Sequence, residues 1–315
     1  MSSARVFSDE ELRIFGMRSV DALAEALDRN DHEGAIDFVR RLRREVLSMI
    51  RNYAGWEVTL KGWIERRDGA DAAERAVLEM ENPEIAPERC GPGDDPVPGW
   101  KAECQSIIAA IEAGETENIL SRANALHQDA LLRHDRGMSR VSALLSFIGR
   151  SAGVEGLDDA LREAMASDMI GNASFRERAE SLMHFTRVHL QTFDLVEDEE
   201  KLTFICPICP SGGRMIADGH YEAPRSDYIV PGPHPLTYGR DEIPVYCCHE
   251  PIMETTSFEG TGVPMFIVDP APELGKGPCK TYLYKNPEAI PEHFFTRLGL
   301  EKPATSLTRS KRTEE

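Results

Sequence analysis

The cysteine pattern in the last third of the chain limits the fold more than any other feature. Five of the seven cysteines lie between residues 206 and 279, as Cys206, Cys209, Cys247, Cys248 and Cys279. A Cys-x2-Cys pair followed further along the chain by a second Cys/His group is the spacing with which two chain reversals present four ligands to a tetrahedral zinc ion. This segment is therefore predicted to bind zinc.

The second group, Cys247–Cys248–His249–Glu250, follows Ile243–Tyr246, which reads as the end of a strand. Alternate side chains of a strand share a face, so Cys247 and His249 are expected to face one metal while Cys248 and Glu250 face the other way. The favoured ligands are Cys209, Cys247, His249 and Cys279, with Cys206 as the main rival for one position.

The metal pattern has two further interpretations. A closed zinc knuckle would hold together loops that are too poor in apolar residues to pack unaided, and four buried thiols could also exist without any metal. An open catalytic zinc usually has three protein ligands and a water molecule. Because this segment offers five or six ligands, a closed site is the more economical interpretation.

The charge of the chain excludes some classes of partner. Among its 315 residues, 36 Lys and Arg face 54 Asp and Glu, which gives a net charge of −18. Nucleic-acid and anionic-membrane binding both need a basic surface, so neither is expected. No apolar run approaches the ~20 residues of a membrane span, and the first residues lack the apolar core of a signal peptide. An odd number of cysteines, partly in metal spacing, fits a reducing compartment. The chain is predicted to be cytoplasmic.

Residues 8–192 have a helical pattern. Capping boxes are expected at Ser8–Glu11 and Ser174–Glu177, where a serine oxygen and a glutamate satisfy free N–H groups. Between them lies an internal repeat in which Leu27 aligns with Ile111 and Gly69 with Gly153, both at an offset of 84. Copies of this kind stack through their apolar faces, so a duplicated helical bundle is expected, with copies at about 21–80 and 105–165. Such a bundle can also form a homodimer.

The pattern changes after the bundle. Short apolar runs separated by Pro and Gly predict a small, mostly β, zinc-binding domain at 193–300, and residues 301–315 read as a disordered tail.

The stretch 81–100, rich in Pro, Gly and Asp, is expected to be an exposed loop that carries an inert Cys90. The predicted fold class is therefore α+β. The expected strands are Lys201–Ile205, Tyr228–Val230, Ile243–Tyr246, Val263–Val268 and Lys280–Tyr284.

Two histidines fall on the apolar stripe of the long helix in the second copy. At 100° per residue, His127 and His134 lie within this stripe, whereas Asp135 projects away from it. A catalytic interpretation makes His134 a general base oriented by a carboxylate, with a partner from His184 or His189. The alternative is that His127 and His134 are ordinary core histidines, bonded to backbone or carboxylate.

Residues Ser211–Gly212–Gly213–Arg214 are predicted to form a tight loop, which is a further candidate site. Their N–H groups and the Arg214 guanidinium could hold a carboxylate or a phosphate. Alternatively, the glycines only let the chain fold closely around a metal. The sequence favours neither of these two interpretations over the other.

Three stretches together resemble a family of bacterial proteins known by its sequence pattern and without an assigned activity. They are His134–Asp135, then Cys209-Pro-Ser-Gly-Gly-Arg214, and then Tyr246-Cys-Cys-His249 followed by Cys279. The family pattern has Gly at the place of Pro210 and often a second Cys at the place of Glu250, so Cys206 is a candidate local substitute. The run 243–285 also faintly resembles the cysteine-bearing end of the 4-vinyl-reductase type of ligand-binding domain.

Two classes of function follow. The first is a zinc-dependent hydrolase or lyase that acts on a small acidic or aromatic metabolite between bundle and metal domain, with His134, Asp135 and His127 as catalytic groups and Arg214 anchoring substrate charge. The second is a non-catalytic sensor or accessory protein that zinc stabilises. Asymmetry favours the enzyme, because His127, His134 and Asp135 occur in one copy of the repeat only. Neither a Gly-x-Gly-x-x-Gly motif nor a P-loop is present to bind a nucleotide.

Overall fold

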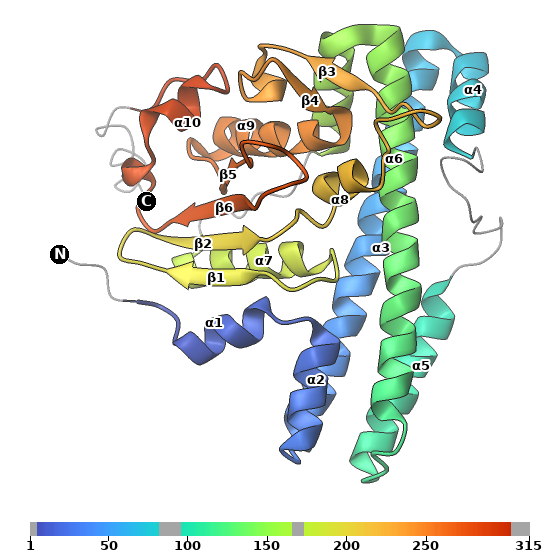
Figure 1. Cartoon of the computed structure of the whole chain (residues 1–315), viewed down its shortest axis with the longest axis vertical. Coiled ribbons are helices and arrows are strands. Elements are labelled where there is room, and N and C mark those ends of the chain that lie inside the picture. Colours follow the sequence, from blue (N-terminus) through green and yellow to red (C-terminus); the bar gives the residue numbers. More distant parts are fainter. Residues whose placement is uncertain (1–4, 82–95, 166–172, 304–315) are drawn as a thin grey trace, which may run out of the picture.

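A computed structural model describes residues 5–81, 96–165 and 173–303 of the chain. The fold is α+β, with a long helical part beside a smaller part built on two antiparallel sheets (Figure 1). The helices of the first part are α1 (Asp9–Gly16), α2 (Ser19–Asp28), α3 (His32–Asp68), α4 (Ala70–Met80), α5 (Pro96–Glu112), α6 (Ile119–Ala164) and α7 (Phe175–Arg187).

The helices α3 and α6 form the axis of the molecule and run side by side in the same direction (Figure 1). Polar contacts join them in order along both helices. Glu57 receives two hydrogen bonds from Arg140, at 2.8 and 2.9 Å, and further on the Trp63 indole donates to Asp159 at 2.7 Å. Glu57 thus meets a residue next to its equivalent in the repeat, because the two are 83 positions apart, whereas Trp63 meets one that lies 96 positions along the chain, beyond its equivalent.

Corresponding positions of the two copies also bend in the same way. Gly69 and Gly153 both have a positive φ, +89° and +68°, where the long helix of each copy breaks before its last turns. A residue with a side chain adopts this region with difficulty, so the two glycines set the length of each long helix. The division into domains at residue 192 stays a prediction.

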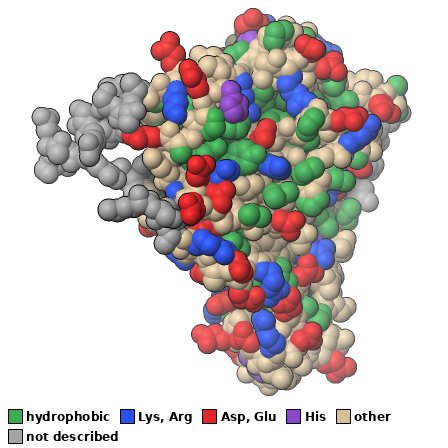
Figure 2. All heavy atoms as spheres, turned by 60° about the vertical axis from the view of Figure 1, so that its left-hand side comes forward, with side chains coloured by type: hydrophobic (Ala, Val, Ile, Leu, Met, Phe, Trp, Pro, Cys, Tyr) green, Lys and Arg blue, Asp and Glu red, His purple; other side chains and the backbone are tan. Residues whose placement is uncertain are grey.

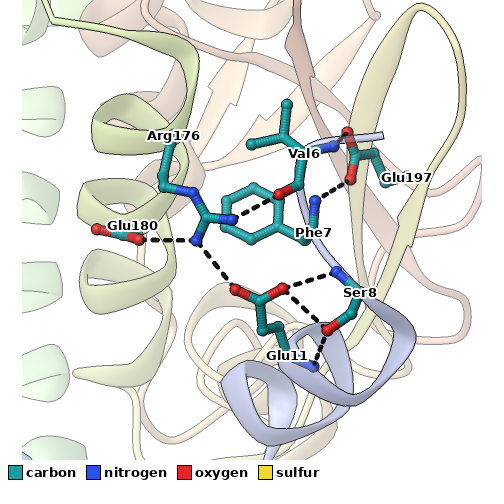
Figure 3. Close-up of polar contacts among 7 residues, drawn as sticks. All are labelled: Val6, Phe7, Ser8, Glu11, Arg176, Glu180 and Glu197. Carbon is teal, nitrogen blue, oxygen red and sulfur yellow. Dashed lines mark hydrogen bonds and ion pairs between the residues drawn. The ribbon is translucent and has the colours of Figure 1, made fainter. Parts of the chain in front are cut away.

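Both capping boxes expected from the sequence are confirmed, at Ser8–Glu11 and at Ser174–Glu177. The first one fastens the N-terminal segment to the rest of the fold (Figure 3). Arg176 of α7 pairs with Glu11 at 3.1 Å and donates to the Val6 carbonyl at 2.5 Å. Glu197 accepts the Val6 and Phe7 N–H groups at 2.8 and 3.0 Å. The start of the chain is therefore held by residues far along the sequence.

The second part of the fold contains a four-stranded antiparallel sheet in the order β1-β2-β6-β5 and a hairpin of β3 and β4. One hydrophobic core continues from the bundle into this part, and a smaller cluster lies under the last helix. The elements are β1 (Asp194–Glu197), β2 (Lys201–Cys206), α8 (Gly212–Ala217), β3 (Ile229–Pro231), η1 (Pro235–Thr237), β4 (Glu242–Pro244), η2 (Val245–Cys248), α9 (His249–Thr261), β5 (Ile267–Asp269), β6 (Cys279–Tyr284), η3 (Pro287–Ala289) and α10 (Glu292–Thr296).

Several expected local structures are wrong. The strand expected at Ile243–Tyr246 ends at Pro244, and a 3₁₀ turn and then α9 carry the following cysteines and histidine. Ser211–Arg214 begins helix α8 instead of forming a loop, and residues 96–100 begin α5. Tertiary packing determines such short elements more than local propensity does. Cys90 and the tail from residue 304 lie outside the described residues.

Acidic and basic side chains are interspersed over the face of the molecule that Figure 2 shows. Many charged side chains of the described residues form surface ion pairs, such as Arg13 with Glu25 at 2.8 Å and Arg162 with Glu259 at 2.8 Å. Within the described ranges, none of the helices is both long enough and apolar enough to cross a membrane.

A glycine permits the closest approach of α3 to α6. A Cβ atom on Gly137 would lie 2.6 Å from two ring carbons of Tyr53, which is closer than real contacts allow. We expect Gly137→Ala to lower the free energy of unfolding by about 1–3 kcal/mol, because the Tyr53 ring has to shift in a packed core.

Gly55→Ala is the matched control for this prediction. A Cβ atom there meets nothing within 4 Å, and Gly55 is exposed on α3. Alanine should stabilise that helix by about 0.5–1 kcal/mol. Denaturant unfolding of both variants measures the difference, and equal effects of the two substitutions would contradict the close packing.

A candidate ligand site lined by thiols and histidines

The cysteines and histidine that the sequence singled out line one pocket between α7, the four-stranded sheet and α9. Its volume is about 90 Å³. Apolar and small polar side chains make up the rest of its wall. The lining residues are Leu182, Phe185, Thr186, His189, Cys206, Cys209, Pro210, Ser211, Gly212, Tyr238, Ile243, Cys247, His249, Glu250, Phe266, Val268, Pro270, Leu274, Cys279 and Thr281.

Backbone geometry brings the four pocket thiols together. Cys206 at the end of β2 lies directly opposite Cys279 at the start of β6. A Cβ atom on Gly212 would lie 2.5 Å from the Cys247 sulfur, so α8 packs against that thiol only because residue 212 is glycine. The Cys209 sulfur lies 3.4 Å from the Ser211 hydroxyl. This favours the interpretation in which the glycines allow close chain packing.

The neighbouring Cys248 is fully buried and does not line the pocket. Strand alternation is not the reason, because both cysteines lie in the helical turn η2. Successive residues of a helical turn project in different directions, and this separates the two side chains.

Three of the pocket thiols, Cys206, Cys247 and Cys279, are neutral near pH 7. Burial raises the pKa of Cys206 and Cys247 well above the ordinary value, and charge on neighbouring thiols would raise it further. Burial likewise raises the pKa of Cys279 to about 11. A thiol that keeps its proton is a poor nucleophile and behaves as a small polarisable apolar group.

His249 and Glu250 form an ion pair at the pocket wall, with Nε2 and Oε1 3.2 Å apart. The His249 Nδ1–H donates to the Tyr246 carbonyl at 2.6 Å, because a carbonyl can only accept. Burial opposes the charged imidazole, but the charge of Glu250 and the hydrogen bonds to Glu250 and to the Tyr246 carbonyl together outweigh it and raise the pKa of His249 above its ordinary value. The two charges offset each other, so the wall carries little net charge.

A buried histidine pair adjoins the pocket. The Nε2 atom of His134 lies 2.8 Å from Nδ1 of His189, which follows α7 and lines the pocket. Burial lowers the pKa of His134 below the ordinary value. The pKa of His189 is well below it, through burial and then through the charges of His134, His249 and Arg214. Both rings are therefore neutral near pH 7.

Arg214 and Asp135 contact the other ring nitrogen of His134, Nδ1. Nη2 of Arg214 contacts Oδ1 of Asp135 and lies 2.9 Å from Nδ1 of His134. Asp135 Oδ1 is also 3.1 Å from that nitrogen. Asp135, expected to project away, thus turns back to its neighbour. The Arg214 guanidinium is thus paired through Nη2 with Asp135 and His134, and its role as a substrate anchor stays a prediction.

The remaining histidines stand apart from this arrangement. His127 is buried, and neither ring nitrogen has a hydrogen-bond partner among the described residues, so it belongs to the bundle core. The His184 Nε2 lies 3.0 Å from the Ser48 hydroxyl. His189 was one of two equal options in the sequence, and no local pattern could have chosen it, because its partner lies on another helix.

The described residues contain no group of three or more His, Cys, Asp or Glu side chains arranged to hold a metal ion. The prediction of a metal-dependent hydrolase or lyase is therefore wrong. Two physical features accompany this result. Cys206, Cys247 and Cys279 keep their protons, and both ring nitrogens of His134 are engaged within the protein.

Zinc content of the isolated protein stays a separate prediction. Metal analysis of the wild type beside Cys247→Ser tests it. One zinc per chain in the wild type and none in the variant would support a metal at the thiols, and metal-free wild type would end the prediction.

Comparison of the chain with protein-family models, with curated proteins and with solved structures finds no significant match in any of the three. The resemblance to a bacterial family therefore stays a prediction.

The buried carboxylate of Glu254 supports one side of the pocket. It accepts hydrogen bonds from the Tyr238 hydroxyl at 2.5 Å and from the Val268 N–H at 2.9 Å, and it pairs with Arg297 at 3.1 Å. Tyr238 and Val268 both line the pocket. Burial raises the pKa of Glu254 to about 7, although its partners favour the charged form.

This shift predicts a pH-dependent stability. The folded state binds the Glu254 proton more tightly than the unfolded state, whose pKa is near 4.5. The contribution of this group to stability is fully present below pH 4.5 and is lost as the pH rises to about 7. The free energy of unfolding of the wild type, relative to Glu254→Gln, should therefore fall between pH 5 and pH 8.

Denaturant unfolding at several pH values measures this difference. Glu259→Gln, on the same helix but half exposed, is the control. Parallel pH profiles of the wild type and Glu254→Gln would contradict the raised pKa.

Proposed function

We propose that this protein binds a small, uncharged and largely apolar molecule in the thiol-lined pocket. The observation that carries the proposal is the pocket itself, where thiols and apolar side chains surround the imidazole of His189. Ligand sites are typically apolar cavities with a few placed polar groups. The pocket supports the expectation of a small-molecule partner.

The size and charge of the pocket narrow the ligand class. An apolar cavity of ~150 Å³ accepts the six carbon atoms of benzene, so about 90 Å³ encloses roughly four non-hydrogen atoms, and a molecule of roughly five to seven would extend from the open side of the pocket. A charged ligand would lose its hydration without gaining an opposite charge, since His249 and Glu250 already neutralise each other. An uncharged ligand avoids that cost.

The His189 ring offers the ligand one free nitrogen. The Nδ1 atom of His189 is engaged by His134, while its Nε2 atom makes no hydrogen bond to any residue that the structure describes. A single hydrogen bond to this nitrogen would fix the orientation of a ligand whose remaining surface contacts apolar wall.

Filling the pocket tests the proposal. Leu274 lines the pocket and is half-buried, so Leu274→Trp should occupy ligand space. Cyclopentanone, a neutral molecule of suitable size, should bind the wild type with a dissociation constant on the order of 1 mM. Binding is followed by ligand-observed NMR and by thermal shift, and the variant should bind at least about tenfold more weakly.

The control is Leu132→Trp, which makes the same substitution at a 57 % exposed position on α6. It should bind like the wild type. Equal binding to Leu274→Trp and to wild type, or no binding to either by any neutral probe of five to seven non-hydrogen atoms, would refute the ligand site.

A further inference from the structure

The hydrogen bonds that end at His189 have a fixed direction. An arginine side chain has five N–H donors and no acceptor, and it does not lose its proton in proteins. The bond between Arg214 Nη2 and His134 Nδ1, 2.9 Å long, can therefore only run from arginine to histidine. In a neutral His134, Nδ1 then carries the lone pair and Nε2 carries the hydrogen.

The same logic continues to the next ring. The Nε2–H of His134 donates to Nδ1 of His189 at 2.8 Å, so this nitrogen is the acceptor. In a neutral His189 the hydrogen must then be on Nε2, the nitrogen without a partner among the described residues. The rings meet edge to face, with centroids 5.1 Å apart and planes at 90°, which fits one directed bond between them.

Asp135 is the competing partner. Its Oδ1 atom lies 3.1 Å from His134 Nδ1 and could accept a hydrogen from it, which would reverse both rings. However, this oxygen already accepts from Arg214, and the Asp135 side chain is 45 % exposed, so water can serve its other lone pairs. Nη2 of Arg214 can donate one hydrogen to Asp135 and the other to Nδ1 of His134. In the reversed arrangement His134 would carry its hydrogen on Nδ1, and this N–H would point at an N–H of Arg214, so no hydrogen bond could form between them.

We infer that Arg214, acting through His134, holds His189 as a hydrogen-bond donor, and that the ligand therefore presents an acceptor such as a carbonyl oxygen. This inference rests on the proposed ligand pocket and names the chemistry that the pocket selects. Arg214 and His134 are positioning residues here, since His189 alone of the three lines the pocket. The groups that face His189 are His134 from α6, Arg214 from α8 and His249 from α9.

NMR of the full chain labelled with ¹⁵N-histidine determines the direction of these hydrogen bonds in the absence of any ligand. Two-bond ¹H–¹⁵N correlation distinguishes the Nε2–H from the Nδ1–H tautomer, and the His189→Gln spectrum assigns His189. The expected wild-type result at pH 7.5 is Nε2–H at both His134 and His189. An Nδ1–H tautomer at His189 would overturn the inference even if cyclopentanone binds.

Two variants separate the roles of the outer groups. Arg214→Met removes the permanent donor, so His134 Nδ1–H can donate to Asp135 and both rings should change to Nδ1–H. Asp135→Asn retains Arg214 and should leave both tautomers unchanged. Unchanged tautomers in a folded Arg214→Met would overturn the role of Arg214. The wild-type spectrum decides the tautomer of His189 even if a variant does not fold.

The selectivity is measured with two probes of the same shape. Cyclopentanone carries an acceptor oxygen, and methylenecyclopentane has a CH₂ group in its place. The wild type should bind the ketone roughly three- to tenfold more tightly, as one hydrogen bond allows, and Arg214→Met should lose this preference. Equal binding of the two probes to wild type would overturn the inference and leave the pocket intact, whereas no binding of either would refute the pocket and leave the tautomer result standing.

Discussion

The close packing of α3 against α6 at Tyr53 and Gly137 is the contact on which the rest of the structure depends. The Tyr53 ring occupies the space that a side chain on Gly137 would fill, and it meets the His134 ring edge to face at 5.6 Å. Its hydroxyl reaches the Tyr246 hydroxyl at 3.2 Å. One residue of α3 therefore touches the long helix, the buried histidine and the turn that carries the pocket cysteine, which joins the bundle to the site.

Buried charged side chains in this framework lie in ion pairs. Two buried arginines, Arg41 and Arg187, surround Glu45 between α2, α3 and α7, with the nearest ion pair at 2.8 Å. Breaking a buried pair of this kind leaves an uncompensated charge and is strongly destabilising. In the pocket, His249 offsets the charge of Glu250, and Cys206, Cys247 and Cys279 keep their protons. An almost neutral interior is the basis for proposing an uncharged ligand.

The histidine pair shows how a surface ion pair can define a buried site. Arg214 and Asp135 are partly exposed. The hydrogen bond from Arg214 nevertheless fixes the tautomer of His134, and His134 in turn fixes the tautomer of His189 in the pocket. Neutral rings can transmit such a direction because each has one donor and one acceptor nitrogen. Both ring nitrogens of His134 are used in this chain of hydrogen bonds.

The sequence by itself determined the local elements of this protein. Capping at Ser8 and Ser174, the break at Gly69 and Gly153, and most strands follow from nearby residues, because helix ends and alternation depend on short-range hydrogen bonding and side-chain period. It also drew attention to the cysteines and to His134. Only the tertiary structure decided what these groups do. The pairing of His134 with His189, the turn of Arg214 inward and the protonation of the thiols depend on burial and on partners from distant elements, and neither can be read from spacing along the chain.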